Sequence, residues 1–127
     1  MGERERAIFE DCLDRVGDAH LKQELGDLIR TIQREGERLG HFRSLPQLEL
    51  YKKKVQEFVA KANRGTFKVK ASSFTDAAGD YSSQLIVEKV DAALESLTKL
   101  VMDKESQAIQ ILEKVGLIKG LLADLYQ

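Results

Sequence analysis

The sequence predicts an all-α protein: an up-and-down-like bundle of four main helices with a short extra helix at the N-terminus. The 127-residue chain has one proline and no tryptophan, and it is rich in the good helix formers Leu, Ala, Glu, Lys and Arg. Its 43% hydrophobic and 32% charged residues are typical of a soluble globular protein. Apolar residues recur every three or four positions, which is the spacing of one helix face. A chain of this length is expected to form a single domain over residues 1–127.

The first predicted helix is short and covers residues 1–17. Its apolar residues recur at helical spacing: Ile8, Phe9, Cys12, Leu13 and Val16. Gly17 followed by Asp18 is typical of a helix end and a new N-cap. A second helix then carries its apolar face to residue 39: Leu21, Leu25, Leu28, Ile32 and Leu39. Because Gly36 lies on that face, we expect another helix to pass close to it.

The third helix is predicted to follow GHFRSLPQ, residues 40–47, which contains the proline. Ser44 and Gln47 have the spacing of a capping box at its start. Its apolar face runs toward residue 70 and contains Leu48, Tyr51, Val55, Phe58 and Ala62. The small and polar residues 71–83, ASSFTDAAGDYSS, are longer than most helix connections. They predict a loop that is either mobile or functional.

The last two helices have clear apolar faces but an uncertain border. The fourth helix is expected to be capped by Asp80, Ser82 or Ser83 and to bury Val87, Val90, Leu94, Leu97 and Val101. The last helix carries Ala108, Ile111, Val115, Ile118, Leu122 and Leu125 at steps of three and four. A compact bundle favours a turn at residues 102–105, where Asp103 is a candidate cap. Since no glycine or proline interrupts the helix there, a single long helix over residues 82–126 remains an alternative.

Three stretches of sequence together resemble a known family. They are GERL at residues 36–39, YKKKVQEFV at 51–59 and IQILEKVGLIKGLLADLY at 109–126. In order and spacing they are similar to the YaaR-like family of bacterial helical proteins, a domain of unknown function. The resemblance covers residues 20–127, and its most specific part is the ending IKGLL-x-x-LY. It implies a small cytosolic helical bundle with no assigned activity, and it supplies no catalytic residue.

Residue types that carry catalysis or bind cofactors do not occur at productive spacing. Cys12 has no evident histidine partner and lies in an apolar stripe, which favours a packed thiol over a reactive one. His20 and His41 lack the Glu-x-x-His spacing by which helical bundles hold iron. No glycine-rich phosphate loop is present. We therefore expect no enzyme activity, no metal site and no cofactor.

The start of the chain and its cysteine content predict a cytoplasmic protein. The opening MGERERAIFEDC places charges where a signal peptide needs an apolar core. One cysteine cannot form an internal disulfide, so nothing marks an oxidising compartment. Lys119 and Asp124 interrupt the longest apolar run, so we expect no membrane-spanning segment.

Basic residues concentrate in the third predicted helix. Residues 44–71 carry seven basic and two acidic side chains, a net charge of +5, whereas residues 72–127 carry five and nine, a net charge of −4. One stripe of the helix contains Lys54, Lys61, Arg64 and Lys68, interrupted by Glu57. Nucleic-acid or nucleotide-phosphate binding along this stripe is the alternative function. A solvated face balanced by the acidic helices is the simpler interpretation, because the isoelectric point is about 6.1.

The last helix carries glycines and a lysine where a buried helix should be apolar. Gly116 and Gly120 share one sector, and each weakens the helix by about 1 kcal/mol relative to alanine. The expected compensation is the close approach of a neighbouring helix, at Gly36. Lys119 falls inside the apolar sector. Either its stem packs while its ammonium group reaches the surface, or it forms a buried ion pair.

Leu117 and Leu121 lie one turn apart among polar residues, on the side of the last helix expected to face water. Either the N-terminal helix folds over them or another chain does. The preferred function is therefore a non-enzymatic interaction protein that binds itself or a protein partner through the last helix, with help from residues 71–83. The candidate interface contains Leu117, Leu121, Gly116, Gly120 and Lys119.

Overall fold

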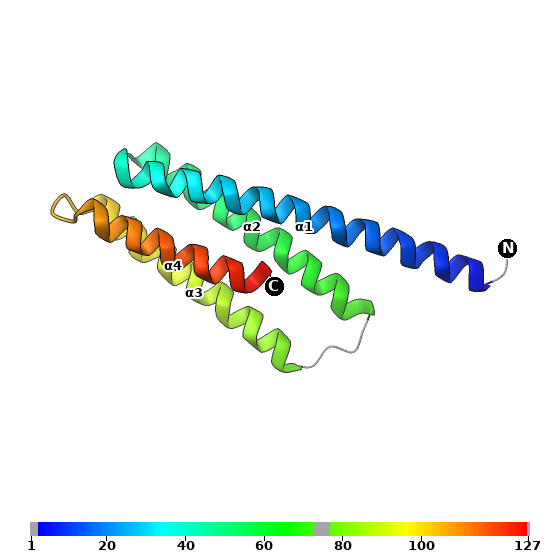
Figure 1. Cartoon of the computed structure of the whole chain (residues 1–127). Coiled ribbons are helices and arrows are strands. Elements are labelled where there is room, and N and C mark those ends of the chain that lie inside the picture. The colour runs from blue at the N-terminus through cyan, green and yellow to red at the C-terminus, as the bar shows by residue number, and fades with distance from the viewer. Residues whose placement is uncertain (1–2, 73–76, 127) are drawn as a thin grey trace.

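The computed structural model describes the backbone of residues 3–72 and 77–126 and the side chains of residues 19–63 and 83–126. Four helices follow one another along the chain: α1 (Glu3–His41), α2 (Leu45–Ser72), α3 (Ala77–Met102) and α4 (Ala108–Tyr126). They alternate in direction and lie side by side (Figure 1). The predicted all-α, up-and-down-like bundle is confirmed.

The bundle consists of two helical hairpins. α1 packs extensively on α2, and α3 packs extensively on α4. The hairpins meet mainly where α1 lies against α4, while α2 contacts α3 and α4 over a much smaller surface. The core contains Leu25, Ile32, Leu39, Leu48, Tyr51, Val55, Phe58, Ala62, Val90, Ala93, Leu94, Leu97, Val101, Ile111, Val115, Ile118 and Leu122. The apolar periodicity therefore predicted most of the core, although Ala108 lies exposed at the start of α4.

The predicted break between the first two helices is wrong. α1 runs without interruption for 39 residues, so Gly17 and Asp18 lie inside it. A glycine ends a helix when it adopts a positive φ, and no glycine of the described backbone does so. The short N-terminal helix over residues 1–17 is thus the first part of α1, apart from residues 1–2, which lie outside the described backbone.

The predicted loop over residues 71–83 is mostly helical. α2 continues to Ser72 and α3 begins at Ala77, so the predicted caps Asp80, Ser82 and Ser83 lie inside α3. Residues 73–76 lie outside the described residues. Alanine and serine are compatible with a helix, so the small and polar composition of this stretch was a misleading signal.

The start of α2 confirms half of the predicted capping box. The backbone N–H of Gln47 donates to Ser44 Oγ at 3.3 Å. The Gln47 side chain turns instead toward α1, where it donates to the backbone oxygen of Glu35 at 3.1 Å and to its Oε2 at 2.7 Å. Glu35 is buried. Gln47 therefore fixes the α1–α2 hairpin and supplies a partner to a buried carboxylate.

The turn between α3 and α4, preferred from the sequence at residues 102–105, is confirmed, but it lies at residues 103–107 because α3 includes Met102. Asp103 Oδ1 accepts the backbone N–H of Glu105 at 3.0 Å, so Asp103 organises the turn and does not cap α4. The N-terminus of α4 is capped by the side chain of Gln110, whose Oε1 accepts the backbone N–H of Gln107 at 2.7 Å. Ser106 is buried, and its hydroxyl donates to the backbone oxygens of Leu100 and Asp103.

Arg43, in the connection between α1 and α2, joins the two hairpins at one end of the bundle. Its Nη1 donates to the backbone oxygen of Ser106 at 2.6 Å. Its Nη2 donates to the backbone oxygens of Leu100 at 2.5 Å and Asp103 at 2.6 Å. The Leu100 carbonyl lies in the last turn of α3, where the helix dipole favours a cation, and those of Asp103 and Ser106 lie in the turn that follows.

Tyr51 is fully buried beside Gly36, and its hydroxyl has no hydrogen-bond partner among the described residues. Burial raises the pKa of the Tyr51 phenol, because ionisation would leave an unsolvated negative charge. The folded protein therefore holds this proton more tightly than the unfolded chain. The stability that follows is complete below the ordinary tyrosine pKa of about 10 and is lost as the pH rises above it.

We expect Tyr51→Phe to raise the free energy of unfolding at pH 7 by up to about 1 kcal/mol, because it removes a buried hydroxyl without a partner. Above pH 10 the advantage should grow by about 1.4 kcal/mol per pH unit, since only the wild type must keep this buried phenol protonated. Urea unfolding of both proteins at neutral and alkaline pH measures the difference. A loss of stability at pH 7 would mean that the hydroxyl has a partner after all.

Candidate interaction surfaces on α4 and α2

α4 lies antiparallel to the C-terminal half of α1 and turns one face to the core. That face contains Ile111, Val115, Ile118 and Leu122. At the end of α4, the Tyr126 hydroxyl donates to the backbone oxygen of Lys22 at 3.1 Å. At its start, Leu112 packs against Gly40. α4 therefore covers α1 from about residue 22 to residue 40.

The glycines that allow this close packing belong to α1. A Cβ atom on Gly36 would overlap the Val115 side chain and would lie 3.2 Å from Cε2 of Tyr51. A Cβ atom on Gly40 would lie 2.5 Å from Cδ2 of Leu112. The prediction that a helix passes close to Gly36 is confirmed, and Gly40 is a second such position that the sequence analysis missed.

The predicted close approach at Gly116 and Gly120 is wrong. Both glycines are exposed, and a Cβ atom on either would meet no atom of the described residues within 4 Å. The reason is the position of α1, which lies on the side of α4 that carries Leu112 and Val115. The glycines lie beyond that side and face outward, as does Ile109, which is 59% exposed.

The two leucines of the candidate interface have different environments. Leu117 is 52% exposed, whereas Leu121 is half-buried and packs against the core. Lys119 is exposed and forms no ion pair with any described residue, so of the two alternatives left open for it the buried ion pair is excluded and the ammonium group lies at the surface. We call Ile109, Gly116, Leu117 and Gly120, with Lys119 at the edge, the outer face of α4.

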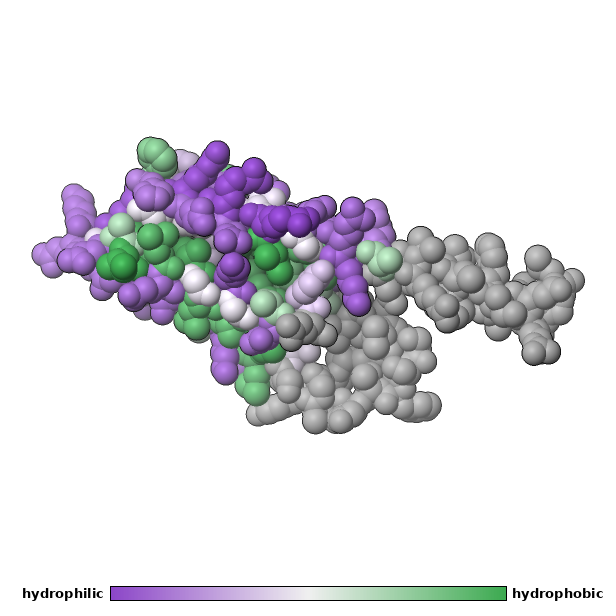
Figure 2. All heavy atoms as spheres, in the orientation of Figure 1, coloured by the Kyte–Doolittle hydropathy of each residue, from purple (hydrophilic) through white to green (hydrophobic). Residues whose placement is uncertain are grey.

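The N-terminal segment does not cover the outer face of α4. α1 continues straight toward the N-terminus and extends past the ends of the other three helices (Figure 1). α4 ends where Tyr126 meets Lys22. Figure 2 shows hydrophobic surface on the side of the molecule where α4 lies, next to the hydrophilic surface of α1. Of the two alternatives, the one in which the N-terminal helix folds over Leu117 is therefore wrong.

The basic stripe of α2 is partly neutralised. Lys54 Nζ lies 3.6 Å from Glu57 Oε2. Lys61 Nζ lies 3.5 Å from a carboxylate oxygen of Glu57 and 3.5 Å from one of Glu24, so it connects α2 to α1. The other two members, Arg64 and Lys68, lie in α2, but their side chains are outside the described part of the chain. Lys61 thus joins two helices and Lys54 is paired within α2, while phosphate binding by the stripe stays a prediction.

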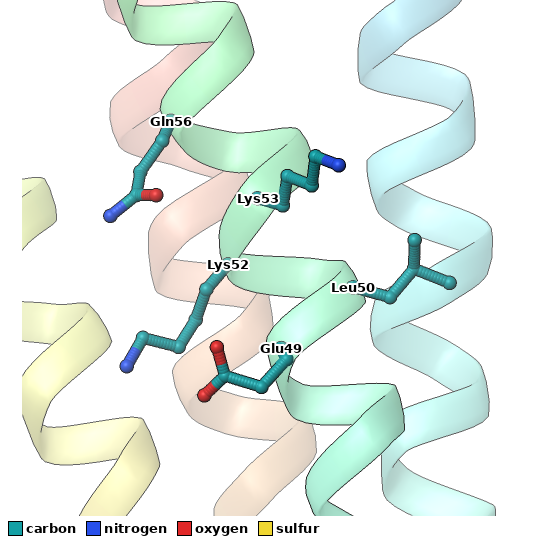
Figure 3. Close-up of a pocket in the computed structure, with 5 residues that line it drawn as sticks. All are labelled: Glu49, Leu50, Lys52, Lys53 and Gln56. Atoms are coloured by element: carbon teal, nitrogen blue, oxygen red, sulfur yellow. The ribbon is translucent and has the colours of Figure 1, made fainter.

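Two further lysines border a shallow depression of about 430 Å³ on α2. Its lining consists of Glu49, Leu50, Lys52, Lys53 and Gln56. In Figure 3, Lys53 and Leu50 extend toward one side of the helix, while Lys52 extends toward the other. The two ammonium groups do not converge, so they do not form a site that could hold one phosphate from two sides.

Metal ligands and membrane spans were sought in the residues that the structure describes. His20 Nε2 lies 2.9 Å from Glu24 Oε1, but no three His, Cys, Asp or Glu side chains there gather in a way that could hold a metal ion. Cys12 lies in the part of α1 whose side chains are not described. None of the helices in the described part of the chain combines the length and apolarity needed to cross a bilayer.

Comparison with known proteins supports both the fold and the family resemblance. The model of a family described as a protein of unknown function, DUF327, matches residues 2–126. The uncharacterised protein YaaR of Bacillus subtilis (strain 168) is 32% identical over 120 residues, which cover 94% of this chain and 82% of that protein.

Two solved structures have the same fold. The crystal structure of the uncharacterised protein BH1478 from Bacillus halodurans has a TM-score of 0.82 and 30% identity, covering 93% of this chain and 97% of that one. Moevan, a designed granulopoietic protein made by topological rescaffolding, has a TM-score of 0.80 and 27% identity, covering 87% and 94%. The resemblance is confirmed and reaches residue 2, not residue 20 as expected. This chain belongs to the DUF327 family of helical proteins.

Proposed function

We propose that this protein is a non-enzymatic, cytoplasmic interaction module that associates with a second copy of itself through the outer face of α4. The observation that carries the proposal is the exposure of Ile109 and Leu117, 59% and 52%, beside two glycines with empty space in front of them. Exposed aliphatic side chains mark an interaction site when they belong to one apolar patch.

A second copy suits this surface because the surface is complementary to itself. A two-fold interface requires one patch to supply both the protruding and the receiving parts. On the outer face of α4, Ile109 and Leu117 protrude, while Gly116 and Gly120 leave room for a side chain. Both charge signs are present nearby in Glu113 and Lys119, which are exposed.

The association should be weak. α4 has 19 residues and is about 28 Å long, so a pair of such helices buries less surface than a standard interface. Covering four half-exposed aliphatic side chains, two from each copy, favours association, and the loss of rotational and translational freedom opposes it. We therefore expect dimers only at a concentration of hundreds of micromolar.

Sedimentation velocity over a range from about 10 µM to about 1 mM measures the association. We expect the wild type to shift from monomer to dimer over this range. The double variant Ile109→Glu with Leu117→Glu should remain monomeric, because each dimer would then bury four carboxylates. Leu121 is left unchanged because it packs against the core.

A matched control carries two glutamates elsewhere on the surface. Leu45→Glu with Leu85→Glu replaces leucines that are 53% and 38% exposed on α2 and α3, and it should dimerise as the wild type does. Thermal unfolding of each variant shows that its fold is intact. A wild type that stays monomeric at about 1 mM, or a control that dissociates as readily as the α4 variant, would refute the proposal.

Phosphate or nucleic-acid binding along α2 is the alternative function. It rests on the net charge of +5 over residues 44–71. It has less support than the outer face of α4, because Lys54 and Lys61 are paired with carboxylates of α1 and α2.

A further inference from the structure

The seam between α2 and α3 contains an open groove of about 280 Å³. These neighbouring helices share a much smaller contact than the other neighbouring pairs. The groove is lined by Val55, Gln56, Val59, Ala60 and Asn63 of α2 and by Val87, Val90, Asp91 and Leu94 of α3. It includes no residue of α4, so it is separate from the surface proposed above for dimerisation.

The groove has an apolar floor and polar edges. Val55, Val90 and Leu94 are buried at its base, and Val59 and Val87 are half-buried. Along α2 the lining extends from residue 55 to residue 63, about 12 Å at 1.5 Å per residue. Anchors at positions i and i+7 of a docked helix lie about 10.5 Å apart. The groove therefore has the length of two turns of a helix.

The two edges of the groove differ in charge. On α2 the edge consists of the uncharged amides Gln56 and Asn63. On α3, Glu88, Asp91 and Glu95 are exposed at steps of three and four residues, so they share one side of the helix. No described residue forms an ion pair with any of these three carboxylates. The three carboxylates are thus an acidic row on α3, of which Asp91 lines the groove and after which the exposed Lys99 follows one turn further on.

We propose that this groove binds a basic amphipathic helix of a protein partner. Aliphatic side chains of the partner helix would cover Val59 and Val87. Its Lys or Arg side chains would lie along the acidic row of α3 and meet Asp91, which is part of the groove itself. Charge complementarity selects this class of partner, because an acidic helix in the same groove would be repelled.

The full chain labelled with ¹⁵N can be titrated with a synthetic helix of about 18 residues built from Leu and Lys, at about 50 mM salt. We expect amide shifts to concentrate at residues 55–63 and 87–95. Fluorescence anisotropy with the same peptide gives the dissociation constant. A Leu and Glu peptide of the same length should bind at least about tenfold more weakly.

Two charge-matched variants separate the groove from attraction to an acidic protein in general. Asp91→Lys should weaken binding of the Leu and Lys peptide about fivefold or more, while Asp124→Lys on α4 should change it by less than about twofold. Both residues are exposed, so neither change disturbs the core. Equal effects of the two variants, shifts centred on α4, or tight binding of the Leu and Glu peptide would overturn the proposal.

Discussion

Arg43→Ala is expected to lower the free energy of unfolding by about 3 kcal/mol, which corresponds to a fall in Tm of about 10 °C for a domain of this size. The guanidinium group donates to three backbone carbonyls of the α3–α4 hairpin. Hydrogen bonds from a charged donor contribute about 1.5 to 3 kcal/mol each, but bonds that share one side chain do not add fully. Loss of the side chain leaves the carbonyls of Leu100 and Ser106 without this donor and separates the two hairpins at one end.

Arg43→Lys should recover only part of this stability. An ammonium group can donate three hydrogen bonds from one point, whereas the carbonyls of residues 100, 103 and 106 are reached by two nitrogens of a planar fork. Arg38→Ala is the matched control, because Arg38 is exposed and its nearest carboxylate oxygen, on Glu35, is 3.8 Å away. It should cost less than about 0.5 kcal/mol.

Chemical unfolding monitored by circular dichroism measures all three variants against the wild type. If Arg43→Ala were no less stable than Arg38→Ala, the hydrogen bonds of Arg43 would be surface contacts that water replaces at no cost. Hydrogen exchange adds a local measurement, because amides of residues 100–107 should lose protection first when the two hairpins separate at this end.

The sequence predicted the helices well where apolar residues repeat over several turns. The buried faces of α2 and α4 were identified apart from Ala108, because the same apolar spacing repeats at every turn of the helix. Helix ends were harder. Gly17 and the small residues after position 71 weaken a helix locally, yet α1 continues through Gly17, α2 reaches Ser72 and α3 begins at Ala77. Local preferences of about 1 kcal/mol do not fix a boundary when the surrounding helix is long.

Contacts between distant segments could not be read from the sequence. Arg43 and Ser106 are 63 residues apart, and the spacing of charged residues gives no sign that they meet. The same limit applied to the candidate site. The periodicity of α4 correctly set Leu117 apart from the core face, but it could not say which neighbour lies beside each sector. Gly116 and Gly120 were therefore assigned to a close contact that α1 makes with Leu112 and Val115 instead.

One substitution, glycine to alanine, should have opposite effects in two helices of this bundle. In α1, Gly36→Ala places a methyl group against Val115 and Tyr51. We expect a loss of about 2 kcal/mol, because Val115 is β-branched and Tyr51 is fully buried, so neither can move aside cheaply. In α4, Gly120→Ala meets empty space and should gain about 1 kcal/mol from the higher helix propensity of alanine.

The two variants should be compared by urea unfolding at about 10 µM, where the proposed dimer is dissociated. At high concentration Gly120→Ala should instead weaken self-association, since the added methyl group occupies space that the second copy would use. If Gly120→Ala raises the free energy of unfolding of the monomer and weakens dimerisation, the glycine lowers helix stability and leaves room for the second copy. An unchanged dimer would mean that the glycine is outside the interface.

A double-mutant cycle tests the cause of the loss at Gly36. If overlap with Val115 is the cause, Gly36→Ala should cost much less in a Val115→Ala background, with a coupling energy of about 1 to 2 kcal/mol. Additive effects would place the cost elsewhere, at Tyr51, whose ring is 3.2 Å from the new methyl group. In either case the outcome locates the point where α1 must approach its neighbours most closely. That contact fixes the side of α4 that faces α1 and so leaves Ile109 and Leu117 in water.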